Sequence, residues 1–178
     1  MEESALVVPV ALPDALEQLR WRYDPLGKAL PPHITLAVPF GQRDLRERIA
    51  PRLKELAAGF EAFSVVGDGI GAFSSDALDT IYLGLQPNDD LERLMQAAQA
   101  AFPEYPPYGG KHVNLVAHVT LARIPEELKQ HVLARAQTAL QEIEPVKLSV
   151  QALAWITGNH DELFTDSFLL RPRAPQIP

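Results

Sequence analysis

The sequence feature that most constrains the fold is a short pattern that occurs twice, each time followed by the same succession of predicted elements. "HITL" begins at His33 and "HVTL" begins at His118. Each histidine precedes a serine in a later predicted strand, Ser64 or Ser149, by the same 31 residues (64 − 33 and 149 − 118). Self-similarity in a fixed register is the signature of a repeated unit. The pattern therefore predicts two related halves with the two histidines in equivalent positions.

Hydrophobic periodicity and breaker residues predict helices that alternate with strands along the chain. Helices are expected at 13–24, 43–59, 88–102 and 125–143, the second of them interrupted at Pro51. Strands are expected at 5–12, 33–40, 60–73, 79–87, 112–123, 146–158 and 162–172. After each His-x-Thr the order is strand, helix, strand, strand, which agrees with the repeat.

Both motifs lie on predicted strands, where side chains two residues apart share a face. The polar face is expected to carry His33, Thr35, His118 and Thr120. The opposite face is expected to carry Ile34, Leu36, Val119 and Leu121. We expect the apolar face to pack against helices and the polar face to line a cleft. Arg123 falls by parity on the apolar side, so its side chain reaches the cleft only if a strand end or a bulge precedes it.

Length and composition indicate one soluble domain. A chain of 178 residues is the size of one domain and buries roughly 70% of its unfolded surface on folding. The absence of cysteine excludes thiolate catalysis, disulfides and cysteine-bound zinc, and fits a reducing cytosol. The opening "MEESALVVPV" is acidic where a signal peptide is basic, and its apolar run is too short to span a bilayer. We therefore expect a cytoplasmic protein in which residues 1–178 form one domain of two duplicated lobes.

The net charge of −7 and the pI of about 5.2 argue against a surface that follows a long nucleic-acid duplex. Non-specific affinity for nucleic acids comes mostly from clustered lysines and arginines. A phosphate bound by this chain is therefore expected in a local pocket. The expected partner is a small nucleotide or the 3' end of an RNA, with no membrane association, and the protein is expected to be a monomer.

The paired motifs resemble those of the two-histidine (2H) phosphoesterase superfamily, which includes 2'-5' RNA ligase-like proteins and 2',3'-cyclic nucleotide phosphodiesterases. The residues that carry the resemblance are "HITL" at 33–36 and "HVTLAR" at 118–123. The stretch "YDPLGKALPPHITLAVPF" is similar to the first motif region of the branch with Asp-Pro before the motif and Pro-Phe after it. The resemblance extends roughly from Leu6 to Arg171.

This resemblance implies an α+β fold of two pseudo-symmetric lobes. Each lobe is an antiparallel sheet flanked by helices, and the lobes face each other across a central cleft. The implied activity is metal-independent hydrolysis of 2',3'-cyclic phosphates or 2'-5' linked phosphodiesters, without a cofactor. Some members of the superfamily also run the reverse reaction as 2'-5' RNA ligases.

The implied chemistry accounts for the residue types in the motifs. Attack on a phosphodiester requires a proton to be removed on one side and delivered on the other, and histidine titrates near neutral pH. We therefore expect His33 and His118 to be the acid–base pair, with either order of roles. Thr35 and Thr120 are expected to donate hydrogen bonds to the phosphate oxygens, where charge is held in the transition state. Arg123 fits either a phosphate contact or a strand-end ion pair.

Two alternatives remain open at this point. The first is a non-catalytic module that binds nucleotides or phosphoesters in the same cleft. The second is a metal site built from the two histidines, which the threonines do not favour because hydroxyls are poor zinc ligands.

Several other residues have ordinary structural interpretations. Phe40 is expected to pack in the core and not to stack on a base. The cleft lining is open to Tyr23, Tyr82 and Trp155, but the core is the expected place because aromatic residues in regular elements are usually core.

Lys111 and His112 precede the second motif in a glycine-rich loop, where a substrate contact is open but a solvated loop is the expectation. His131 is expected on a helix surface and His160 in a turn between two strands.

Overall fold

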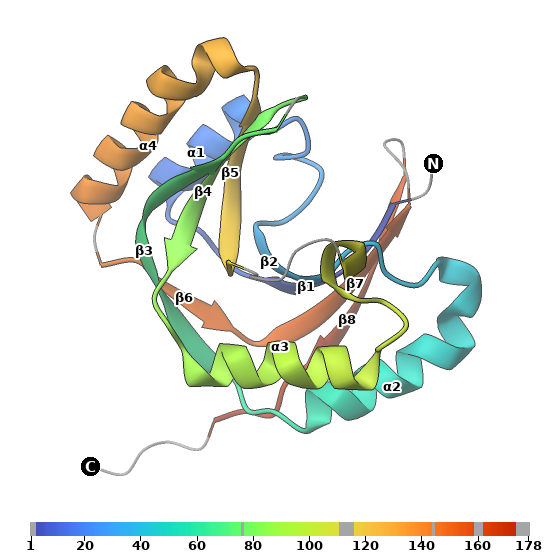
Figure 1. The fold of residues 1–178 in the computed structure, drawn as a ribbon. Coiled ribbons are helices and arrows are strands. Elements are labelled where there is room, and N and C mark those ends of the chain that lie inside the picture. The colour runs from blue at the N-terminus through green and yellow to red at the C-terminus, as the bar shows by residue number, and fades with distance from the viewer. Residues whose placement is uncertain (1–2, 76, 111–115, 144, 159–161, 174–178) are drawn as a thin grey trace, which may run out of the picture.

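The computed structural model describes residues 3–75, 77–110, 116–143, 145–158 and 162–173 (Figure 1). The α-helices are α1 (Asp14–Tyr23), α2 (Arg46–Ala58), α3 (Asp89–Ala101) and α4 (Lys129–Ile143). Short 3-10 turns are η1 (Arg43–Leu45), η2 (Pro107–Gly110) and η3 (Glu126–Leu128). The strands are β1 (Glu3–Pro9), β2 (His33–Ala37), β3 (Phe63–Phe73), β4 (Asp79–Leu85), β5 (His118–Ile124), β6 (Lys147–Val150), β7 (Ala152–Gly158) and β8 (Leu163–Leu169).

All four predicted helices are confirmed, with one correction inside α2. The sequence predicts an interruption at Pro51, but α2 continues through this residue. Proline removes one bond to the carbonyl four residues earlier, here that of Glu47. Glu47 and Pro51 are both exposed, so this carbonyl lies where water replaces the lost donor.

The strands form one curled antiparallel sheet in the order β6-β3-β4-β5-β2-β1-β7-β8. The α+β class and the antiparallel strands are confirmed, and the two expected sheets are halves of a single sheet that meet at β5 and β2. The predicted strand 146–158 divides at Gln151 into β6, which pairs with β3, and β7, which pairs with β1. The divided strand therefore connects the two ends of the sheet.

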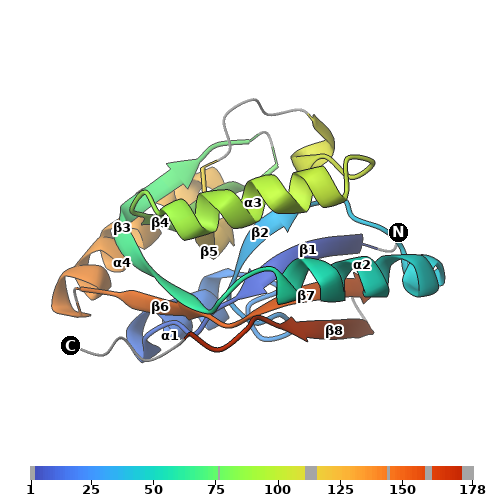
Figure 2. The same ribbon diagram turned by 90° about the horizontal axis from the view of Figure 1, so that it is seen from below.

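The helices cover the sheet in two pairs, as the two views in Figures 1 and 2 show. α1 and α4 pack against each other and against β3, β4 and β5, while α2 and α3 pack together and against β2, β7 and β8. Ile34 of β2 and Val119 of β5 are fully buried in the core between helices and sheet. No helix in the described part of the chain is both long enough and apolar enough to cross a lipid bilayer.

Candidate active site

The two motifs lie side by side on the two central strands of the sheet. β2 and β5 pair antiparallel with Ile34 opposite Val119. In this register His33 is the neighbour of Thr120, and Thr35 is the neighbour of His118. Residues directly opposite each other in antiparallel strands have Cβ atoms roughly 4.5–5.5 Å apart. The structure thus brings all four predicted side chains together on the face opposite the core.

Each central strand contains a bulge at the same place in its motif. Between β1 and β2 the register shifts at Leu36, and between β4 and β5 it shifts at Leu121. The extra residue reverses the alternation of side chains beyond it, because a strand has a period of two. Arg123 therefore shares the face of His118 and Thr120, which is the outcome that required a bulge before it. It also forms an ion pair with Asp24, so the expected strand-end ion pair is present, while the phosphate contact stays a prediction.

The two imidazole rings are held by the same backbone contact. His33 Nδ1 lies 2.8 Å from the carbonyl oxygen of Pro31, and His118 Nδ1 lies 2.7 Å from that of Val116. A carbonyl oxygen only accepts hydrogen bonds, so Nδ1 carries the proton in both rings. In the neutral state each ring therefore presents an unprotonated Nε2, the nitrogen that can accept a proton from a nucleophile.

The surroundings favour the neutral form of both histidines. Burial lowers the pKa of His33, the bond to the Pro31 carbonyl opposes the shift, and the charges of Arg20 and Arg123 lower it further. Burial also lowers the pKa of His118, the Val116 carbonyl opposes this, and Arg123 adds to the lowering. A bound phosphate would act in the opposite direction, because a nearby negative charge favours the imidazolium.

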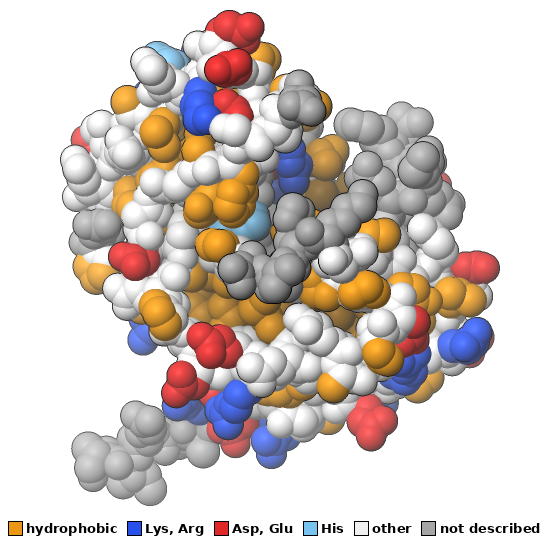
Figure 3. Space-filling model, in the orientation of Figure 1, with side chains coloured by type: hydrophobic (Ala, Val, Ile, Leu, Met, Phe, Trp, Pro, Cys, Tyr) orange, Lys and Arg blue, Asp and Glu red, His pale blue; other side chains and the backbone are white. Residues whose placement is uncertain are grey.

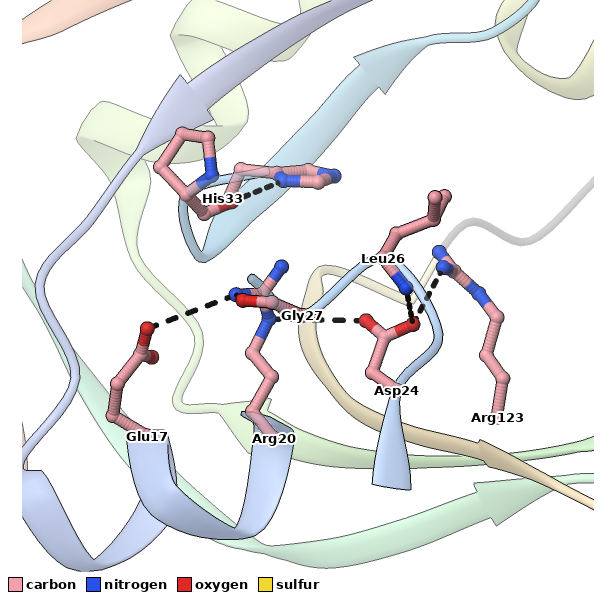
Figure 4. Close-up of polar contacts among 8 residues, drawn as sticks. Glu17, Arg20, Asp24, Leu26, Gly27, His33 and Arg123 are labelled. Atoms are coloured by element: carbon pink, nitrogen blue, oxygen red, sulfur yellow. Dashed lines mark hydrogen bonds and ion pairs between the residues drawn. The ribbon is translucent and has the colours of Figure 1, made fainter. Parts of the chain in front are cut away.

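A buried ionic network supports the site from below, as Figure 4 shows. The carboxylate of Asp24 accepts a hydrogen bond from Arg123 Nη1 at 3.0 Å, and Arg20 Nε lies 3.8 Å from its other oxygen. The Leu26 amide also donates to Asp24, at 3.1 Å. Asp24 thereby fixes the guanidinium of Arg123, whose charge reaches both histidines.

An aromatic wall stands beside His118. The rings of Phe73 and Tyr82 are stacked with centroids 4.3 Å apart, and each centroid is 5.1 Å from that of His118. Gly71 lies opposite Tyr82 in the β3–β4 pair, and a Cβ there would come within 2.4 Å of the Tyr82 ring. The assignment of Tyr82 to the core is therefore wrong. Figure 3 shows a hollow on this face of the molecule in which a histidine side chain lies beside hydrophobic side chains.

A further residue at the site is Tyr108, whose hydroxyl is hydrogen-bonded to the side chain of Thr35. The sequence patterns indicated neither Tyr108 nor Arg20 as a site residue. Asp24 was noted only as the aspartate of the Asp-Pro pair before the first motif. The signals that could have found them are an Arg–Asp pair four residues apart before the first motif and a tyrosine followed by two glycines.

The other candidates mostly take their expected places. Phe40 and Trp155 are buried and in contact with each other, and Tyr23 packs against the same core. His131 is exposed on α4. Lys111, His112 and His160 lie outside the described residues.

Comparison with known proteins places the chain in a family. Residues 8–162 match the family model described as the 2'-5' RNA ligase superfamily. A relative from Geobacillus kaustophilus that carries the name phosphoesterase is 30% identical over 117 residues, 65% of this chain and 64% of that protein. Another from Bacillus pumilus, of the same name, is 33% identical over 119 residues, 63% of each chain. The chain thus spans less than two thirds of the length of these relatives.

Two solved structures share the fold. A Thermus thermophilus protein superimposes with a TM-score of 0.62 at 16% identity, covering 98% of this chain and all of that one. Escherichia coli LigT in complex with 3'-AMP gives 0.59 at 14% identity, with 96% and 98% of the two chains covered. The family model covers most of the chain, and the paired His-x-Thr strands lie inside the match. The protein therefore belongs to the 2'-5' RNA ligase superfamily of two-histidine phosphoesterases.

Proposed function

We propose that the protein is a phosphodiesterase that opens 2',3'-cyclic phosphates or cleaves 2'-5' linkages at nucleotide or RNA 3' ends, leaving a monoester. The observation that carries the proposal is the pair of imidazoles with the same Nδ1–carbonyl contact on adjacent strands. This arrangement offers two Nε2 atoms on one face, next to two threonine hydroxyls and the guanidinium of Arg123.

The proposed chemistry uses one histidine in each protonation state. The neutral ring takes a proton from a water molecule that attacks phosphorus, and the imidazolium gives its proton to the ribose oxygen that leaves. The P–O bond to water forms as the P–O bond to the ribose breaks, so the reaction ends with the two protonation states exchanged. Thr35, Thr120 and Arg123 stabilise the charge on the non-bridging oxygens. The same steps in reverse would join a 2' end, as in ligation.

The aromatic wall supports a nucleotide substrate. Bases stack on exposed aromatic rings with little regard to base identity, and Phe73 is 39% exposed next to His118. The related LigT has been solved with 3'-AMP and with NADP+. A nucleotide held by its base on Phe73 and Tyr82 would place its phosphate near the two histidines.

Incubation with the four nucleoside 2',3'-cyclic phosphates and a 2'-5' dinucleotide, in EDTA, tests the proposal. Products resolved by chromatography should show ring opening of at least one cyclic phosphate or cleavage of the dinucleotide. The absence of turnover of every substrate between pH 5 and pH 9 would contradict the proposal. Calorimetric binding of these compounds without turnover would support the non-catalytic binding module instead.

The pH dependence of kcat/KM should have its maximum on the acidic side of neutrality. The free enzyme needs one neutral and one protonated imidazole, and both pKa values lie below the ordinary 6.5. The active form is therefore most abundant below pH 6.5, and kcat/KM should fall as the pH rises through 7 because the second proton is lost. Initial rates at subsaturating 2',3'-cyclic AMP would measure this. Arg123→Gln should move the profile towards higher pH, and a wild-type maximum at or above pH 7 would contradict the assignment.

Removal of the outer ring of the aromatic wall should weaken nucleotide binding selectively. Stacking on an aromatic side chain contributes about 1–3 kcal/mol per base, so Phe73→Ala should raise KM for 2',3'-cyclic AMP roughly 5- to 150-fold. Glycerol 1,2-cyclic phosphate, which has no base, should be turned over equally by both proteins. Phe164→Ala removes a ring that packs against Arg43 and is the matched control. Equal losses with both substrates would show that Phe73 does not contact the base.

A further inference from the structure

Lys129 is the first residue of α4, a position that does not suit its charge. The unpaired amides at the N-terminus of a helix favour negative charge, so a lysine there is unfavourable unless another group compensates it. The compensating group is Asp79 at the start of β4, whose Oδ2 lies 3.3 Å from Lys129 Nζ. Asp79 is buried, and this oxygen has no hydrogen-bond partner in the part of the chain that the structure describes. The ion pair therefore anchors the ammonium group at this point.

The same ammonium group also donates a hydrogen bond to the hydroxyl of Ser74. Ser74 directly follows Phe73, which is the last residue of β3 and pairs with Thr80 of β4. Lys129 thus connects the start of α4 with both strands where they separate, at the end of the β3–β4 pair (Figure 1).

The turn between β3 and β4 is closed on itself and stands apart from the segment before α4. Ser75 Oγ donates to the carbonyl of Leu78 at 2.7 Å and accepts from the amide of Leu78 at 3.2 Å. A cleft of about 570 Å³ lies between this turn and residues 125–127. The hydrogen bond from Lys129 to Ser74 crosses from α4 to the turn, so it ties the turn to the rest of the molecule.

Phe73 depends on this tie because burial does not hold its ring. Phe73 is 39% exposed and contacts the rings of Tyr82 and His118. A stacked contact lets a ring slide within its own plane, so the backbone at the end of β3 determines where the Phe73 ring lies. A movement of Ser74 would therefore displace the outer ring of the aromatic wall.

We propose that Lys129 is a positioning residue for nucleotide binding, which fixes the end of β3 through Ser74 so that Phe73 stays stacked beside His118. The proposal rests on the base-binding role proposed above for the aromatic wall. Lys129 is bound to Asp79 and Ser74, and its effect on the substrate passes through the ring of Phe73.

Ser74→Ala tests this role, because it removes the contact with β3 and leaves the ion pair between Lys129 and Asp79 in place. With 2',3'-cyclic AMP, KM should rise about 3- to 10-fold, the order of one hydrogen bond, while kcat stays nearly unchanged. With glycerol 1,2-cyclic phosphate, which has no base, KM should not change. In a Phe73→Ala background the same substitution should change KM for 2',3'-cyclic AMP less than about 1.5-fold, because the ring through which it acts is absent.

Two further variants separate the lysine from the turn. Ser75→Ala removes a hydroxyl that bonds to Leu78 within the turn, and it should leave both KM values unchanged. Lys129→Met combined with Asp79→Asn removes the lysine without stranding a buried carboxylate, and it should reproduce the selective rise in KM. An equal rise in Ser75→Ala, or a wild-type KM in Ser74→Ala, would overturn the proposal. So would an equal effect on the substrate without a base, or an undiminished effect in the Phe73→Ala background.

Calorimetric titration with 3'-AMP and with inorganic phosphate applies the same test without a chemical step. Ser74→Ala should weaken the binding of 3'-AMP about 3- to 10-fold, leave phosphate binding unchanged, and have no effect on 3'-AMP in the Phe73→Ala background. This pattern in a protein that turns over no phosphodiester would uphold the role of Lys129 and refute only the phosphodiesterase function. Equal losses for the two ligands, or a wild-type protein that binds 3'-AMP no more tightly than phosphate, would overturn the role even if the enzyme is active.

Discussion

Alanine at either His33 or His118 is expected to reduce kcat on a 2',3'-cyclic phosphate by about 10²- to 10⁴-fold, the usual contribution of a general acid or base. The two rings have the same Nδ1 contact with a backbone carbonyl and lie on paired strands. Each would act on its own side of the phosphorus, so neither can substitute for the other. One has to take a proton on the side of the nucleophile while the other gives one on the side of the leaving group. Single-turnover rates at saturating substrate would measure the loss.

The two histidines should also behave as one unit. Once either ring is absent the concerted transfer is lost, so the double variant should be little slower than the worse single variant. His131→Ala, which changes an exposed histidine on α4, is the matched control and should keep full activity. Multiplicative losses in the double variant, or a single variant within tenfold of the wild type, would contradict an acid–base pair.

The local rules that worked on this sequence are those of strand alternation and breaker residues. They predicted all four helices and placed Ile34 and Val119 in the core beneath the motif histidines. They also stated the condition under which Arg123 joins the site, namely a bulge before it, and that bulge is present. These features depend on residues close together in one strand or turn, so they can be predicted from a single sequence.

Features that depend on pairing between distant strands could not be predicted from the sequence. The 31-residue spacing suggested equivalent places for Ser64 and Ser149, but it could not show that these two residues pair with each other between β3 and β6. The break at Gln151 sends one predicted strand to both ends of the sheet, and no local residue pattern records which strands it joins. Proximity between Tyr108 and Thr35 likewise arises from the tertiary fold, across more than seventy residues of chain.

Asp24→Asn should cause the largest loss of stability among substitutions around the site. The side chain of Asp24 is 2% exposed and interacts with two guanidinium groups, those of Arg20 and Arg123. Removal of one partner from a buried ion pair leaves an uncompensated charge and costs about 3–5 kcal/mol. For a chain of this size that corresponds to a fall of about 6–20 °C in melting temperature, measurable by calorimetry.

A matched variant shows whether burial is the reason for this loss. Asp166→Asn breaks the ion pair with Arg46, in which the side chains are 35% and 52% exposed, and such surface pairs contribute little to stability. If Asp24→Asn costs no more than Asp166→Asn, the network is not a supporting element of the fold. The double variant Asp24→Asn with Arg123→Gln removes one of the stranded cations and should recover part of the stability, while activity stays low because the phosphate has lost its arginine. Stability regained without activity would separate the two functions of Asp24. It pairs with the buried Arg20, and it positions Arg123 at the site.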